Sequence, residues 1–202
     1  MKKIGIALSI LTVLLYACKD EDVITQNELT STQAARDNLI AEQIFNDAGR
    51  MVEAGFDANP DHKLGPTYTI MNSDTSNSDT LIVNFGASTI SNNTTIRSGK
   101  IISVYTGRYR DSLSVTTTTF DHYHVNYNLV QGERIITNQG RNNNGNMWFT
   151  IEIKNASINT SNGTINWESS RIREWVSGQN TYFNISDDRY MITGTASGNS
   201  VN

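Results

Sequence analysis

Apolar and polar residues alternate with a period of two from residue 67 onward, and this alternation restricts the fold more than any other feature of the chain. Because successive side chains of a strand point to opposite faces of a sheet, the pattern predicts strands with one buried face. Turns rich in Asn, Asp, Ser and Gly separate them, as is typical of antiparallel hairpins. The predicted strands lie at 68–70, 81–85, 100–108, 113–120, 122–125, 130–138, 147–154, 156–159, 164–176 and 190–195.

These strands predict a mainly β fold, an antiparallel meander of about nine or ten strands that forms an open barrel, a roll or a sandwich. Four glycines inside this region are spaced by 33, 31 and 31 residues: Gly99, Gly132, Gly163 and Gly194. The spacing indicates either regular hairpins or a true repeat of about 32 residues, and a repeat would favour an elongated solenoid-like sheet. A fourth copy would only have begun at residue 202, so a repeat would also mean that the β domain at 67–202 lacks its last part.

An amphipathic helix is predicted before the strands, within residues 31–56. Apolar residues recur at spacings of three and four from Ala34 to Phe56, which indicates a helix over 32–54 with Gly55 close to its end. We expect its apolar stripe to lie on the sheet. A helix that binds a membrane surface is the less favoured alternative, because the polar face is not basic.

The first 17 residues have the layout of a cleaved signal peptide, with Lys2 and Lys3 before an uncharged run at 4–17. That run is too short to span a bilayer, which needs about 20 apolar residues. The sequence Leu15-Tyr16-Ala17-Cys18 resembles the lipobox of bacterial lipoproteins, in which the cysteine receives acyl chains such as palmitate. We therefore expect cleavage before Cys18, lipidation of that cysteine, and a polar tether over the rest of 18–30.

Removal of the leader lowers the basic residues from 16 to 14 against 20 acidic ones, which leaves a mature charge of −6. A negative chain is a poor partner for nucleic acid. The acidic run KDED at 19–22 resembles the export signal of surface lipoproteins of Bacteroidota. We therefore expect an outer-membrane lipoprotein that faces either the periplasm or the cell surface.

Two pairs of arginines, each spaced by one residue, are the leading candidates for a ligand site: Arg108 with Arg110, and Arg171 with Arg173. Residues two apart on a strand share a face, and equivalent strands would bring the pairs together as a patch suited to carboxylate or phosphate. The alternative is that Asp111 and Glu174, which stand beside them, neutralise the patch as cross-strand ion pairs.

Two histidines, His122 and His124, would share one strand face, as in strand-borne metal sites. Because His62 lies in a loop and no carboxylate completes the set by spacing, no metal and no other cofactor is expected. The strand aromatics suit either a core or a ligand pocket, and alternation places Trp167 in the core. No hydrolase motif or phosphate loop occurs, so no enzymatic activity is expected.

The segments RSGKIISVYTGRYRD, TTTTFDHYHVN, ERIITNQG and INWESSRIREWVSG resemble a group of uncharacterised Bacteroidota lipoproteins with an all-β domain. The resemblance covers roughly residues 68–195, and TGRYRD and SSRIREW are its distinctive parts. It implies an envelope location and a β architecture, and brings no activity and no catalytic residues. Relatives often carry cysteines near the equivalents of Phe85 and Gly86, which this chain lacks, so no shared redox or metal role is implied.

Together these features predict a non-catalytic outer-membrane or surface lipoprotein, held at the membrane by the lipid on Cys18. Its β domain is expected to bind a glycan, a small ligand or a partner protein. Two other classes stay open, an envelope structural or assembly component and an exported hydrolase with an unrecognised site.

Overall fold

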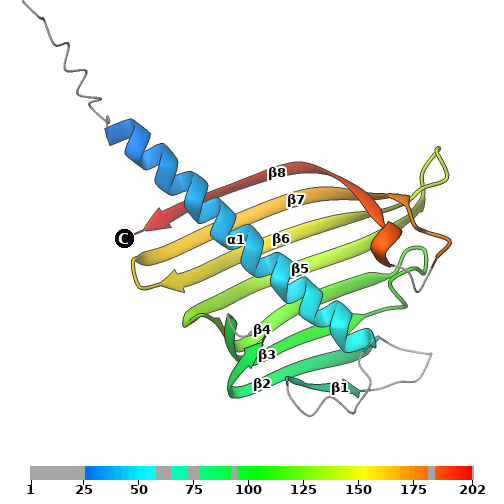
Figure 1. Cartoon of the computed structure of the whole chain (residues 1–202), viewed down its shortest axis with the longest axis horizontal. Coiled ribbons are helices and arrows are strands. Elements are labelled where there is room, and N and C mark those ends of the chain that lie inside the picture. The colour runs from blue at the N-terminus through cyan, green and yellow to red at the C-terminus, as the bar shows by residue number, and fades with distance from the viewer. Residues whose placement is uncertain (1–25, 58–64, 72–77, 92–94, 182–184, 202) are drawn as a thin grey trace, which may run out of the picture.

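The computed structural model describes residues 26–57, 65–71, 78–91, 95–181 and 185–201. A single helix, α1 (Gln26–Asp57), lies over one face of an open sheet of eight antiparallel strands that follow one another in chain order (Figure 1). The mainly β meander with one N-terminal helix is therefore confirmed. The strands are β1 (Thr67–Met71), β2 (Asp79–Ser91), β3 (Thr95–Tyr105), β4 (Val115–Val125), β5 (Asn128–Arg141), β6 (Met147–Thr160), β7 (Gly163–Ser177) and β8 (Arg189–Val201), with a short 3-10 turn η1 (Ile185–Asp187) before the last.

The core lies between α1 and the sheet face that it covers. Phe45 of α1 contacts the rings of Phe120 and Trp167, with centroids 5.6 and 5.8 Å apart. The core position predicted for Trp167 is confirmed, and so is the helix stripe from Ile40 to Val52, whereas its predicted members Ala34, Leu39 and Phe56 are exposed. Buried α1 residues recur at spacings of three and four: Ala41, Ile44, Phe45, Ala48 and Val52. Alternate strand residues face them, among them Leu81, Val83, Ile101, Tyr123, Val130, Ile153 and Ile158.

The helix crosses the sheet diagonally, from a point beyond β8 at its N-terminal end to β2 and β3 at its C-terminal end (Figure 1). It begins at Gln26, earlier than the predicted residue 32, because 26–31 contains no glycine or proline that would stop it. Residues 26–30, predicted as tether, are therefore helical. The leader at 1–17, Cys18 and the rest of the tether lie outside the described residues.

The sheet has eight strands where nine or ten were predicted, because two predicted breaks are β-bulges inside continuous strands. His122 in β4 and Asn155 in β6 have positive φ values of 47° and 52°, and the pairing register shifts beside each. A bulge inserts an extra residue and locally disrupts the alternation without ending the strand. Sequence reasoning therefore mistook each bulge for a turn.

Two of the evenly spaced glycines lie opposite these bulges. A Cβ on Gly99 (φ 79°) would lie 2.1 Å from the carbonyl oxygen of His122, and one on Gly132 (φ 117°) would lie 2.7 Å from Cα of Ala156. Only glycine permits both the positive φ and this approach. Gly163 instead opens β7, so the four glycines do not hold equivalent places in the sheet.

The other face of the sheet is open to solvent and carries Thr, Ser, Asn, Glu and scattered aliphatic residues. The two outermost strands differ in length: β1 has five residues and β8 has thirteen. In the part of the chain that the structure describes, no helix has the length and apolar character needed to cross a membrane.

Candidate functional site

The first predicted arginine pair lies in the loop between β3 and β4 and not on a strand. β3 ends at Tyr105, and the loop turns around Asp111, whose carboxylate accepts a hydrogen bond from the backbone N–H of Arg108 (2.9 Å). The prediction that Arg108 and Arg110 share a strand face is therefore wrong, as is the predicted ion-pairing role of Asp111. Arg108 is exposed, whereas Arg110 donates to the carbonyl of Gln179 (2.9 Å).

The second pair lies on β7. Residues two apart on a strand share a face, and Arg171 and Arg173 both face α1. Arg171 lies 3.4 Å from the carboxylate of Glu42, and Arg173 lies 3.8 Å from that of Glu53, both on the helix. Glu174 points to the opposite face, where it accepts a hydrogen bond from Asn146 (2.7 Å). The neutralising carboxylates thus come from α1, and the predicted four-arginine patch does not form.

Arg173 is surrounded by aromatic rings. Its guanidinium carbon lies 5.2–5.5 Å from the ring centres of Tyr109, Phe149 and Tyr190, and it donates a hydrogen bond to the hydroxyl of Tyr109. Tyr109 stacks on Phe149 with centroids 4.4 Å apart, and Arg110 lies 4.2 Å from the ring of Trp175. Rings on several sides favour a cation through their quadrupoles and keep bulk water away.

Arg134 of β5 completes this cluster and was not predicted from the sequence. It is only 5% exposed, and its guanidinium lies against the backbone of α1, where a Cβ on Gly49 would come 2.8 Å from Cζ. It forms no hydrogen bond or ion pair with any described residue. A signal was present, since Arg134 has the same parity as Val130 and Ile136, which places a charged residue on the buried face of the strand.

We call Tyr109, Arg134, Phe149 and Arg173 the arginine–aromatic cluster. Burial and the neighbouring charge of Arg173 lower the pKa of Arg134 to about 10, so the guanidinium remains charged at neutral pH. Burial raises the pKa of Tyr109 to about 12, although Arg173 opposes the shift, so this phenol remains a neutral donor. Nε of Arg173 is also buried without an acceptor among the described residues. The cluster therefore presents more positive charge and more donors than its own side chains satisfy.

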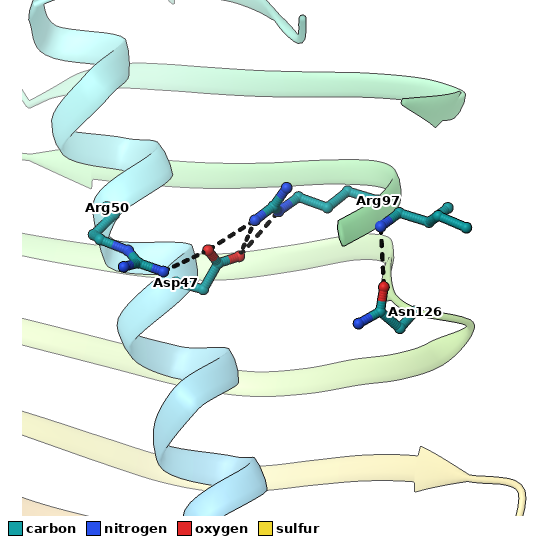
Figure 2. A network of polar contacts seen from close by, with 5 residues as sticks. Asp47, Arg50, Arg97 and Asn126 are labelled. Carbon is teal, nitrogen blue, oxygen red and sulfur yellow. Dashed lines mark hydrogen bonds and ion pairs between the residues drawn. The ribbon is translucent and has the colours of Figure 1, made fainter. Parts of the chain in front are cut away.

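A second buried arginine has a carboxylate directly opposite it (Figure 2). Arg97 of β3 is 4% exposed and donates three hydrogen bonds of 2.8–2.9 Å to both carboxylate oxygens of Asp47. Arg50 approaches the same carboxylate at 3.0 Å from the exposed side of α1, and Asn126 fixes the neighbouring backbone of Ile96. This pair joins the helix to the sheet and gives Arg97 a counter-charge, although Nη1 of Arg97 is buried without a hydrogen-bond partner among the described residues.

The histidines considered for metal binding are held by other groups. His122 is exposed in its bulge with Nδ1 2.7 Å from Asp121, and Nδ1 of His124 lies 2.8 Å from the carbonyl oxygen of His122. The described residues contain no group of three potential metal ligands, and His62 lies outside them.

Two open grooves lie over β6, β7 and β8 on the face away from α1, with volumes of about 610 and 310 Å³. Outward amides and hydroxyls line the larger one, among them Asn166, Ser197 and Asn199, together with Glu168. Its one aromatic neighbour, Trp167, turns its indole inward and donates Nε1–H to Asn38 of α1 (2.8 Å). The groove thus offers hydrogen-bonding groups for a polar ligand and no aromatic ring on which a sugar would stack.

Comparison of the chain with protein-family models, curated proteins and solved structures finds no match. The protein class that the structure defines is an open antiparallel β meander covered by one helix.

Proposed function

We propose that this chain is a non-catalytic lipoprotein of the bacterial outer membrane, and that its β domain binds a small anion between Arg134 and Arg173. The lipobox-like sequence before Cys18 supports the anchor, and the acidic residues after it support a surface location. The observation that carries the binding role is Arg134, a charged side chain that is buried without an acceptor.

A buried charge without a partner is unusual because its desolvation costs several kcal/mol. Glu53 offsets part of the positive charge, but its closest approach is to Arg173, and half of its side chain is exposed. Two guanidinium groups thus share one distant carboxylate. A bound anion would supply the missing negative charge and accept the unused N–H donors.

The surroundings favour a small carboxylate- or phosphate-bearing group. The guanidinium is a planar fork that matches two oxygens of either group. Next to Arg134 on the covered face, Thr118 shares a hydrogen bond of 2.8 Å with Ser103, and both hydroxyls are buried. The hydroxyl that accepts this bond keeps a proton to donate, which is a further polar contact for an anion.

The test is thermal melting of the mature chain carrying Cys18→Ala, with phosphate, acetate or glucuronate added at constant ionic strength. We expect at least one anion to raise the melting temperature, because a ligand that binds only the folded state stabilises it by mass action. Arg134→Met should abolish the shift, and Arg134→Lys, which keeps the charge without the fork, should reduce it. Arg108→Ala is the matched control because Arg108 is exposed and outside the cluster.

A wild-type chain that responds to none of these anions would contradict the proposal, as would an Arg134→Met protein that responds as wild type does. The anchor has a separate test. Full-length protein carrying Cys18→Ala should lose lipid labelling and membrane fractionation, and retention of both would contradict lipidation.

A second candidate is an envelope protein that binds a neutral glycan, and the larger outer groove favours it. Amides and hydroxyls such as those of Asn166 and Asn199 suit sugar hydroxyl groups. A glycan array separates the two candidates, because Asn166→Ala with Asn199→Ala should abolish binding in the groove and leave any response to anions unchanged. The envelope structural role stays open as the class in which neither ligand binds.

A further inference from the structure

The longest exposed edge of the sheet is β8. All thirteen of its residues are paired with β7, from Arg189 opposite Ser177 to Val201 opposite Thr164. No described strand pairs with the other side of β8, because β8 is the last strand in the order of the sheet. Every residue of β8 except Ala196 is exposed.

This edge lacks the features that keep edge strands single. Natural edges are short, or carry charges, prolines or inward-pointing lysines that block pairing. β1 at the opposite edge is short, with five residues. From Tyr190 to Val201 the strand YMITGTASGNSV has no charged residue and no proline. Its outward-pointing main-chain N–H and C=O groups, about half of the total, thus meet no other described strand over a long stretch.

The side chains of β8 are divided by size. Large exposed residues occupy the first part, with Tyr190 38%, Met191 52% and Ile192 59% exposed. From Gly194 to Ser200 the residues are Gly, Thr, Ala, Ser, Gly, Asn and Ser. An antiparallel copy of the same strand would place its small part opposite the large part of the first.

We propose that the occupant of this edge is a second copy of the chain, whose β8 pairs antiparallel with the first about a two-fold axis at Thr195. This register overlaps all thirteen residues and puts Ile192 opposite Gly198 and Tyr190 opposite Ser200. No like charges face each other, because Arg189 meets Val201. The pairing is isologous and closed, so it ends at a dimer.

The helix adds a second contact for the same partner. The first turns of α1 project past β8 in Figure 1, and residues 32–36 are exposed. A second sheet continued from β8 would lie beneath this projection. The inference does not rest on anion binding, although Tyr190 of β8 also lies against Arg173 of the arginine–aromatic cluster, 5.2 Å from its guanidinium carbon.

The experiment is light scattering during gel filtration of the mature chain carrying Cys18→Ala, over a range of concentrations. We expect a dimer. Thr195→Lys should convert it to a monomer, because two ammonium groups would meet at the axis on the face away from α1. Ser170→Lys is the matched control, since Ser170 is the partner of Thr195 on β7 and lies one strand inside the edge.

Cysteine variants in the Cys18→Ala background test the register, because no other cysteine is present. Thr195→Cys should form an intermolecular disulfide, since identical residues face each other only at the axis, within the Cα separation that a disulfide allows. Thr193→Cys and Ser197→Cys should each fail alone and cross-link when mixed. A wild-type monomer at all concentrations, an open-ended aggregate, or a dimer that persists in Thr195→Lys would each overturn the proposal.

Discussion

Arg97 and Arg134 are both buried beneath α1, and they differ in what the helix offers them. Arg97 meets Asp47 and donates three short hydrogen bonds, whereas Arg134 meets the backbone at Gly49, two residues further along the helix. The first arrangement is an ion pair with a carboxylate in direct contact, although Nη1 of Arg97 is left without a partner among the described residues. The second leaves a charge for which the described residues provide no acceptor, and this difference separates a residue that holds the fold together from one that suits a ligand.

The largest expected effect comes from breaking the buried pair of Arg97 and Asp47. Asp47→Asn leaves Arg97 buried without its counter-charge, and we expect the free energy of unfolding to fall by about 3–5 kcal/mol. Urea unfolding at pH 7 measures the change. Arg50→Ala removes the exposed partner of the same carboxylate and should cost roughly 0.5 kcal/mol or less. Equal losses in the two variants would refute the importance of the buried pair.

The incomplete site should respond in the opposite direction. Replacing an unpaired buried charge with an apolar side chain of similar length relieves its desolvation, so Arg134→Met should raise the free energy of unfolding by about 1–2 kcal/mol in anion-poor buffer. A loss of stability comparable to that of Asp47→Asn would mean that Arg134 has a partner in the folded chain.

The same variant has a defined pH dependence. The pKa of Arg134 is lowered from 12.5 to about 10 in the folded state, so its destabilising contribution is present below pH 10. As the pH rises from about 10 toward 12.5, the folded protein loses this proton before the unfolded chain does, and stability gains. The advantage of Arg134→Met over wild type should therefore begin to shrink near pH 10 and continue to shrink toward pH 12.5.

A neutral contact beneath the same helix provides the intermediate case. Asn38→Ala removes the acceptor of the Trp167 indole N–H, and the tryptophan is 4% exposed. We expect a loss of about 1–2 kcal/mol, because a buried donor without its acceptor costs that much. In chemical denaturation, the loss of stability for Asn38→Ala should be smaller than that for Asp47→Asn and larger than that for Asp121→Asn.

The smallest effect is expected at an exposed ion pair. Lys100 and Asp121 lie 2.9 Å apart with about two-fifths of each side chain exposed. The hydrogen bond from Lys100 and the contact with His122 lower the pKa of Asp121, so any stabilisation is present above the usual carboxyl pKa and is lost as the pH falls through the folded value. Asp121→Asn should not change the melting temperature measurably at pH 7. A clear fall in the melting temperature would show that an exposed ion pair contributes to the stability of this fold.

The sequence predicted the fold class well because period-two alternation and a three-and-four helix stripe both survive in the structure. It failed at His122 and Asn155, where bulges resemble turns in a single sequence. It also failed at Arg108 and Arg110, because Asp111 folds that stretch as a loop. Strand spacing shows which residues share a face of one strand. It does not show which helix residues lie over that face, so the partners of Arg171 and Arg173 could not be predicted.

Anion binding at Arg134 is tested most directly by anomalous diffraction from crystals of the protein grown with bromide as the monovalent anion. We predict an anomalous peak within hydrogen-bonding distance of the guanidinium of Arg134, on the side toward Arg173, and no such peak at Arg97. An empty site with Arg134 hydrogen-bonded to main-chain carbonyls would contradict it.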